Sequence, residues 1–303
     1  MKVLVTGGSG FIGKRLRLIR PDWVYVSSKD YDLTSSYQTR AMIRDHRNLD
    51  AIVHLAGKVG GIKDNTEKQA EYIYQNVKIN TNVVHESYKE NVPRLLSALS
   101  TCVFPDSLDS YPFRESDIFK GPPAVSNFSY GYAKRCLHVM SNAYRKQYGV
   151  NYNTFAPSNI YGPEDHFDDE SSHFIPAAIS KFHKASPGAT VQFWGTGGPL
   201  RQQLYVDDLC RAIPNLLDEH NGDQPIIVAP DYNLSISSMV KMCKDIIGKD
   251  VSYSFNGLLD GQYRKDGSNA RFKQMFSSFE FTPFEEGIRK TYEWYEEMVG
   301  ARL

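Results

Sequence analysis

Short apolar runs alternate with longer amphipathic stretches along the first half of the chain. The five runs lie at residues 2–6, 23–26, 51–55, 94–99 and 152–156. They are short and mostly rich in β-branched residues, which is typical of buried strands. The stretches between them space their apolar residues as helices do, over 38–46, 67–90 and 129–147. Alternating strands and helices predict an α/β fold with a doubly wound parallel sheet of the Rossmann type.

This alternation ends near residue 163, where an acidic and polar segment begins. We therefore predict two units, a Rossmann domain over 1–163 and a smaller α/β substrate domain over 164–303. Segments within 203–229 are expected to return to the first unit, because they include two short apolar runs. Further helices are predicted over 173–184 and 283–298, the second of which ends the smaller domain.

The balance of charges and the length of the apolar runs limit which partners the protein can have. Lys+Arg and Asp+Glu both number 35, so the formal net charge is zero. A neutral chain argues against nucleic acid as a partner. No apolar run reaches the length of a membrane span, so no membrane interaction is expected. Because Lys2 is followed at once by a strand-like run, we expect no signal peptide.

Four cysteines form neither a metal-binding spacing nor a dense disulfide framework. We therefore predict no metal, and a reducing, cytoplasmic setting. Cys136, Cys210 and Cys243 are expected in the core, whereas Cys102 ends a strand and is considered below.

A glycine-rich segment, GGSGFIG at residues 7–13, follows the first strand and opens a helix. Gly7, Gly10 and Gly13 are spaced as in dinucleotide-binding turns, where glycine lets backbone N–H groups approach a pyrophosphate. Phe11 and Ile12 begin the helix whose N-terminal end faces that phosphate. Because the segment follows a strand and opens a helix, we favour cofactor binding over an ordinary glycine-rich turn.

The end of the second strand indicates which dinucleotide is bound. NAD-binding folds usually place a carboxylate there, on the ribose 2′-hydroxyl. This chain has Ser27, Ser28 and Lys29 instead, which suit a 2′-phosphate. We therefore favour NADP(H) over NAD. The alternative is that Lys29 is an ordinary solvated lysine in a loop. Asp32 and Leu33 are expected to border the adenine.

Other strand ends complete the predicted cofactor cleft, because ligands of open α/β sheets bind at the carboxyl ends of strands. Leu55 and Ala56 end the third predicted strand, and Pro157, Asn159 and Ile160 follow the fifth. We expect all five to contact the cofactor, with Asn159 also within reach of a substrate.

Tyr130 and Lys134 lie four residues apart in a predicted helix, and therefore on one face. A tyrosine with its usual pKa near 10 is a poor acid–base catalyst at neutral pH. A cation held beside it lowers that pKa, so the pair is a candidate catalytic unit. Alone, the pair is more often an ordinary surface feature.

Taken together, GGSGFIG, the Ser-Thr-Cys at 100–102, the Tyr130–Lys134 pair and PSNIYGP at 157–163 resemble the extended short-chain dehydrogenase/reductases. Within that family, the segments LAGKVGGI, LSTCVFPD, HFIPAAI and WGTGGPLRQQLYVDDL resemble the GDP-L-fucose synthases. The resemblance covers essentially the whole chain. It implies epimerisation of GDP-4-keto-6-deoxy-mannose at C3 and C5, followed by NADPH-dependent reduction at C4.

The resemblance also implies roles for five side chains. Cys102 matches the residue that moves protons at C3 and C5, and His173 matches its acid partner. Ser100 matches the hydroxyl that binds the C4 oxygen, Tyr130 the proton donor, and Lys134 the residue that tunes it. Without the resemblance, Cys102 would be a core cysteine and His173 a structural residue. A thiol is a plausible base only where nearby positive charge lowers its pKa.

Four side chains are expected to bind the substrate. Arg201 matches a substrate arginine of the family, while Lys181 stands where bacterial members have arginine. Lys265 is expected near the pyrophosphate or guanosine, and Trp194 near the sugar or base. Each lysine is equally plausible as a solvated charge, whereas for Trp194 a core role is the weaker alternative. The resemblance further implies a homodimer built on the 67–90 helix and the Tyr130 helix.

Two alternatives remain open on the sequence. One is another nucleotide-sugar epimerase or dehydratase of the same superfamily, which would lack the Cys102 thiol. Dehydratases that resemble this chain have an Asp-Glu pair at this point, whereas this chain has Thr101-Cys102. The other is a non-catalytic NADP-binding regulator, which would not need both Tyr130 and Lys134.

Overall fold

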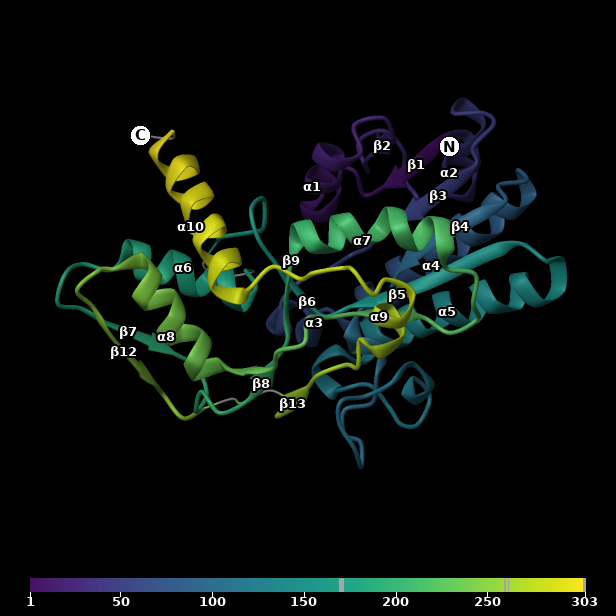
Figure 1. The fold of residues 1–303 in the computed structure, drawn as a ribbon. Helices are drawn as coiled ribbons and strands as arrows, with labels where there is room; N and C mark the ends of the chain where they lie inside the picture. Colours follow the sequence, from purple (N-terminus) through teal and green to yellow (C-terminus); the bar gives the residue numbers. More distant parts are fainter. Residues whose placement is uncertain (169–171, 259, 261, 302–303) are drawn as a thin grey trace.

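A six-stranded parallel sheet organises the first part of the molecule (Figure 1). The computed structural model describes residues 1–168, 172–258, 260 and 262–301. The sheet has the order β10-β5-β4-β3-β1-β2, with every neighbouring pair parallel. Its strands are β1 (Val3–Thr6), β2 (Val24–Val26), β3 (Ala51–His54), β4 (Arg94–Ala98), β5 (Asn151–Pro157) and β10 (Ile226–Val228). The predicted parallel α/β fold is confirmed.

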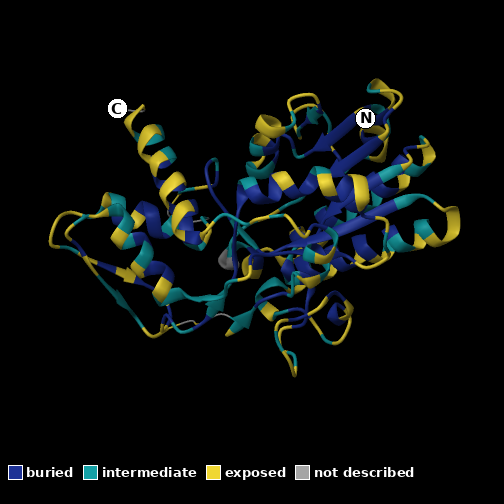
Figure 2. Ribbon diagram, viewed as in Figure 1, coloured by how far each residue is buried: buried dark blue, intermediate teal, exposed yellow. Residues whose placement is uncertain are grey.

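Helices cover both faces of this sheet, because its strands are apolar on both sides. Val3 and Val5 face the layer that contains α1 (Phe11–Ile19) and α7 (Val206–Glu219). Leu4, between them, points to the opposite layer. That layer contains the helices α2 (Ser36–Asp45), α4 (Gln69–Lys89) and α5 (Phe128–Tyr148). Figure 2 shows the sheet buried between helices that expose only their outer surfaces.

A second lobe has a hydrophobic core of its own, around Phe182, Val240 and Ile288. Its helices are α6 (Phe174–Lys184), α8 (Ile236–Ile247) and α10 (Phe284–Gly300), beside the paired strands β7 (Thr190–Phe193) and β12 (Ser252–Phe255). Small sheets lie between this lobe and the large sheet. They are formed by β6 (Asn159–Tyr161) with β9 (Gln203–Tyr205), and by β8 (Leu200–Arg201) with β11 (Leu234–Ser235) and β13 (Arg264–Lys265). The short helix α9 (Ala270–Met275) packs against β10.

The helix predicted over 67–90 is α4 (Gln69–Lys89), except that Glu67 belongs to a separate short helix before it. α3 (Ile62–Glu67) ends at Lys68, whose φ of −115° and ψ of 36° are not helical, and α4 begins directly after it. The helical spacing predicts one inward stripe with Ile73, Val77, Asn80 and Val84, of which the structure buries Asn80 and Val84. Ile73 is exposed, whereas Tyr72 and Asn76 face inward, because their polar groups find partners in the loop after β3 and in α3.

The cysteines are free, and one lies elsewhere than predicted. Cys210 and Cys243 are buried as expected, but Cys136 is exposed on the outer side of α5. Among the described residues, no three His, Cys, Asp or Glu side chains gather as metal ligands. None of the described helices combines the length and apolar character needed to cross a membrane.

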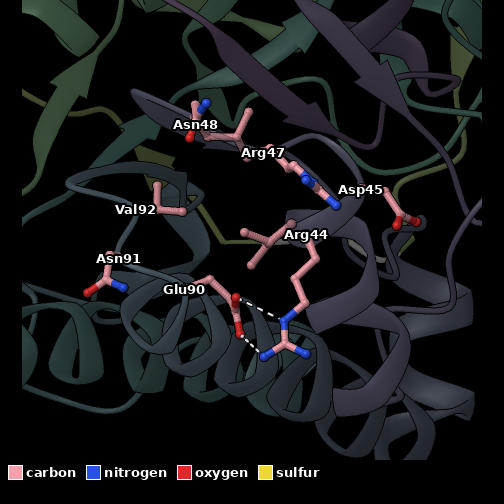
Figure 3. Close-up of a pocket in the computed structure, with 9 residues that line it drawn as sticks. Arg44, Asp45, Arg47, Asn48, Glu90, Asn91 and Val92 are labelled. Carbon is pink, nitrogen blue, oxygen red and sulfur yellow. Dashed lines mark hydrogen bonds and ion pairs between the residues drawn. The ribbon is translucent and has the colours of Figure 1, made fainter.

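A pocket at the amino-terminal edge of the sheet lies away from the strand ends named above (Figure 3). It is lined by the segments that follow α2 and α4, where Arg44 pairs with Glu90 at 3.0 Å. Ligands of open α/β sheets bind at the carboxyl ends of the strands. The candidate site therefore lies at the opposite edge.

Candidate active site

The glycine-rich turn between β1 and α1 is shaped for a pyrophosphate. Gly7 has a φ of 76°, and its carbonyl accepts a hydrogen bond of 3.0 Å from the Gly10 N–H. A Cβ at Gly13 would lie only 2.4 Å from the Gly7 oxygen, so glycine alone lets α1 start this close. Phe11 and Ile12 begin α1, whose first turn has neither a side-chain cap nor an acidic residue. Its backbone N–H groups therefore remain available to an anion.

Serine side chains follow β2 as predicted, but one of them is engaged. The Asp30 carboxylate accepts hydrogen bonds from the Ser27 backbone N–H at 2.8 Å and from its hydroxyl at 2.7 Å. These hydrogen bonds lower the pKa of Asp30. Ser28 and Lys29 are exposed beside this turn. They remain the free groups suited to a 2′-phosphate.

Asp32 and Leu33 serve the local fold. The Asp32 carboxylate accepts hydrogen bonds from the backbone N–H and the hydroxyl of Thr34. The Leu33 side chain packs in the core between the sheet and α4, and its carbonyl accepts a hydrogen bond from Asn82. That the two residues border the adenine stays a prediction.

The carboxyl ends of β3 and β5 lie along the same edge of the sheet as the glycine-rich turn. A Cβ at Gly7 would lie 2.9 Å from the Ala56 nitrogen, so the turn touches the segment Leu55–Ala56 after β3. Pro157 ends β5, and Asn159 and Ile160 follow half-buried in β6. All five residues thus lie at or just after the carboxyl ends of β3 and β5, and their contact with the cofactor stays a prediction.

The helix α5 approaches the turn after β4 at Gly131. A Cβ on this residue would lie 2.6 Å from the Cys102 carbonyl oxygen, far closer than such atoms can approach. Glycine therefore lets Tyr130 and Lys134 lie against the segment 100–102. Both side chains are buried, so they face the interior and not solvent.

Burial decides the protonation of this pair. The Lys134 ammonium donates a 2.9 Å hydrogen bond to the Ala98 carbonyl and lies 5.9 Å from the centre of the Tyr130 ring. Burial lowers the pKa of Lys134 to about 8. Burial also raises the pKa of Tyr130, and the neighbouring Cys102 and Tyr72 raise it further. The net pKa of Tyr130 is therefore raised and not lowered as predicted, because burial dominates, and the phenol stays protonated.

A lysine from the end of the chain lies beside the thiol. Lys265 in β13 donates to the Cys102 sulfur at 3.1 Å, and the Ser100 hydroxyl accepts from the Cys102 N–H at 3.3 Å. Burial raises the pKa of Cys102, but the charge of Lys265, with hydrogen bonds from Ser100 and Lys265, outweighs it, so the net pKa is lowered. The cation that a thiol base requires is therefore present.

A second cation accompanies Lys265. β13 pairs with β8 so that Lys265 lies opposite Arg201. Burial lowers the pKa of Arg201, while the negative charges of Asp260 and Cys102 oppose this effect. The guanidinium donates to the Leu200 carbonyl at 2.7 Å. Two cations thus lie on neighbouring strands near the thiol, where an anionic substrate would be attracted.

His173 is the N-cap of α6 and is paired with a carboxylate. Its Nδ1 lies 3.4 Å from Oδ1 of Asp165. The hydrogen bond with Asp165 raises the pKa of His173, whereas burial and the charge of Lys265 lower it, and the net pKa is raised. The charge of Lys265 thus lowers the pKa of both Cys102 and His173.

Two predicted substrate residues lie farther along the second lobe. Lys181 donates to the Gln192 carbonyl at 3.1 Å and lies 5.2 Å over the Phe193 ring. Trp194 is 69 % exposed, so its indole is free to pack on a ligand and is not a core residue. Within the described residues, neither side chain has a recorded contact with Cys102 or His173.

Sequence reasoning missed Asp165, which contacts His173. It lies in an acidic segment without helical or strand periodicity, where the sequence does not distinguish one carboxylate from another. Its position after YGP, on the same edge of the fold as His173, was the only clue available. The contact itself depends on the tertiary structure.

Comparison with known proteins agrees with this arrangement. A family model described as the NAD dependent epimerase/dehydratase family matches residues 3–234. A probable GDP-L-fucose synthase of Drosophila melanogaster is 34 % identical, with 98 % of this chain and 97 % of the relative covered. The chain belongs to the GDP-L-fucose synthase family. The family member of Escherichia coli (strain K12) is 30 % identical over 98 % of this chain and 97 % of its own.

A solved structure from the same family shares the fold. It is a GDP-L-fucose synthetase from Naegleria fowleri bound to NADP, with a TM-score of 0.90 and 32 % identity. The alignment covers 98 % of this chain and 93 % of that one. The resemblance inferred from the motifs, to this family and to its Rossmann fold, is therefore confirmed.

Replacing Gly131 by alanine should displace α5 from the turn at Cys102. We expect kcat to fall by about 10²-fold, because small misplacements of reacting groups have effects of this size. The measurement is steady-state turnover, with circular dichroism to verify folding. Gly300→Ala is the matched control, since a Cβ there meets nothing within 4 Å. Full activity of Gly131→Ala would contradict the close approach.

Replacing Lys265 by methionine should raise the pKa of Cys102, because the cation that favours the thiolate is removed. Alkylation by iodoacetamide at pH 7 should slow several-fold, and the pH of half-maximal rate should move upward. A Cys136→Ser background removes the exposed thiol. Lys181→Met, which removes a cation of the second lobe, should leave the rate unchanged. An unaltered pH profile in Lys265→Met would refute the contact.

Proposed function

We propose that this protein converts GDP-4-keto-6-deoxy-D-mannose to GDP-L-fucose by 3,5-epimerisation and subsequent NADPH-dependent reduction of the 4-keto group. The observation that carries the proposal is the Cys102 thiol beside Lys265, in the turn that α5 reaches with Tyr130. A reductase alone needs the tyrosine but no activated thiol. Relatives named GDP-L-fucose synthase match over nearly the whole chain.

NADP(H) fits the turn at Gly7, Gly10 and Gly13, where a Cβ would fill the space that backbone N–H groups need. When bound, it supplies the two electrons for reduction at C4. Ser28 and Lys29 would hold its 2′-phosphate, and Lys134 its nicotinamide ribose. The relative from Naegleria fowleri was solved with NADP.

Epimerisation requires a base and an acid on opposite faces of the sugar carbon. The 4-keto group acidifies the neighbouring C–H bonds at C3 and C5. The Cys102 thiolate removes the proton and becomes a thiol, and the His173 imidazolium returns a proton from the other side. The directions of the two pKa shifts suit these roles, because the base is favoured unprotonated and the acid protonated.

The C4 oxygen needs hydrogen-bond donors, both during enolisation and during reduction. Ser100 and Tyr130 would donate to it, and the phenol would give up its proton as the ketone becomes an alcohol. The raised pKa of Tyr130 keeps that proton available. The Lys134 ammonium stabilises the phenolate that forms.

The substrate diphosphate requires cations at the mouth of the site. Arg201 suits phosphate or sugar hydroxyls through its planar fork. Lys181 and Lys265 add positive charge, Trp194 offers an exposed ring, and Asn159 reaches the sugar or the nicotinamide. Lys265 would then serve both the thiol and the substrate.

One assay separates this proposal from its alternatives. NADPH and GDP-4-keto-6-deoxy-mannose are mixed with the protein, and absorbance is followed at 340 nm. Consumption with formation of GDP-L-fucose supports the proposal. Binding without consumption supports a non-catalytic regulator, and a product not inverted at C3 and C5 supports another nucleotide-sugar enzyme.

The two half-reactions should separate by mutation. In Cys102→Ser, we expect loss of solvent deuterium uptake at C3 and C5, measured by NMR, since a serine hydroxyl is a far weaker base than a thiolate. Tyr130→Phe should retain NADPH binding and lose reduction by about 10²-fold or more. Normal deuterium uptake in Cys102→Ser would refute the role of the thiol.

We also propose a homodimer built on α4 and α5, whose outer surfaces expose Tyr74, Tyr132 and Val139. Sedimentation should give twice the 34.4 kDa chain mass. The double variant Tyr74→Glu/Val139→Glu should sediment as a monomer, and Tyr37→Glu on α2 should not. A monomeric unmodified protein would contradict the proposal.

Free cysteines fit a reducing, cytoplasmic setting.

A further inference from the structure

Asp165 is a buried carboxylate that the proposed reaction has not used. Its side chain is 1 % exposed, and its Oδ1 lies 3.4 Å from Nδ1 of His173. The same oxygen accepts a 2.8 Å hydrogen bond from the His166 backbone N–H. Its other oxygen is buried with no hydrogen-bond partner among the described residues. A buried carboxylate with so few donors is costly, so its retention calls for an explanation.

The fold holds this carboxylate in place through an unusual turn. Gly162 and Glu164 have φ values of 152° and 71°, and the Asp165 N–H donates to the Gly162 carbonyl at 3.3 Å. A Cβ at Gly162 would collide with the Val206 side chain, so the turn is pressed against α7. Glu164 points elsewhere and pairs with Lys14 at 2.9 Å.

We propose that Asp165 is the positioning residue of His173, fixing a proton on Nδ1 and directing Nε2 toward the substrate as the acid of the epimerisation. This inference rests on the proposed function for its catalytic meaning. Asp165 accepts from Nδ1, so Nε2 is the nitrogen left for the sugar. The His173 side chain is 45 % exposed, which leaves that nitrogen accessible.

The charges around His173 support this assignment. Asp165 faces it from the turn after β6, and Lys265 faces it from β13. The carboxylate favours the imidazolium, whereas Lys265 disfavours it. Without Asp165, the nearby cation would drive His173 toward its neutral form. The imidazolium could then no longer return a proton to the sugar carbon.

The test begins with the protein alone, so that it does not depend on the proposed reaction. Histidine labelled with 13C and 15N is introduced, and the His173 resonance, identified by its loss in His173→Gln, is followed with pH. We expect a pKa above that of free imidazole and, in the neutral form, a proton on Nδ1. A neutral ring protonated on Nε2, or a depressed pKa, would overturn the proposal even if no Asp165 variant folds.

Two isosteric substitutions then provide a matched comparison. Asp165→Asn should lower the pKa of His173, and Asp165→Glu should restore it in part. Glu164→Gln removes the same charge one residue away and should leave His173 unchanged. Equal shifts in Asp165→Asn and Glu164→Gln would show a general field effect and would overturn the assignment, as would no shift in Asp165→Asn.

The final measurement uses the substrate. Deuterium uptake at C3 and C5 should fall by about 10²-fold in Asp165→Asn at pH 8, with less loss at lower pH, where the imidazole is still protonated. NADPH binding should be unchanged. A uniform loss at every pH would indicate a merely structural role. If His173 titrates as expected but no deuterium enters the sugar in the unmodified protein, the proposed function fails and the Asp165–His173 pairing stands.

Discussion

The contact between the Lys265 ammonium and the Cys102 sulfur joins positions 163 residues apart, and the chemistry of the site depends on it. Strand pairing and backbone hydrogen bonds between distant segments bring Lys265 close to Cys102. β13 lies beside β8, and the segment around Gly267 bridges to Phe113 in the loop after β4. Phe113 exchanges backbone hydrogen bonds with Asp266 and Ser268, at 2.9 and 2.8 Å. The second lobe is thus attached to the very loop that begins with the thiol.

Burial and this contact together shift the pKa values of Cys102, Tyr130 and Lys134 in different directions. Burial raises the pKa of Cys102, but the charge and hydrogen bond of Lys265, with a hydrogen bond from Ser100, lower it overall. Cys102 in turn adds to burial in raising the pKa of Tyr130. Lys134, deeper still, has its pKa lowered by burial alone. The same small region therefore favours a base and two proton donors at one pH, which is what successive enolisation and reduction require.

The sequence supported the elements that repeat and those that follow a local rule. The parallel sheet follows from alternating apolar runs, and the turn at Gly7 follows from glycine spacing and its place after a strand. Where local rules compete, prediction failed. The periodicity from residue 67 onward does not show the helix boundary at Lys68, and Cys136, which was expected in the core, is exposed on α5.

Contacts between distant segments could not be predicted from local sequence patterns. Nothing near Lys265 in the sequence distinguishes a cation at a thiol from one at a phosphate. Asp30, which turns back onto Ser27, and Asp165, which reaches His173, both stand among other acidic residues. In each case the tertiary structure determines which residue the carboxylate contacts. The backbone turns that bring the two residues together cannot be predicted from the residue types alone.

The last strand of the large sheet has a consequence for how the chain is made. β10 pairs with β5, although some 70 residues separate them, and α7 between them supplies Leu209, Ile213 and Leu216 to the core beneath the sheet. A nascent chain emerging from the ribosome therefore exposes the edge of β5 and an uncovered apolar face until residue 228 has left the exit tunnel. This interval is when a chaperone would be needed most.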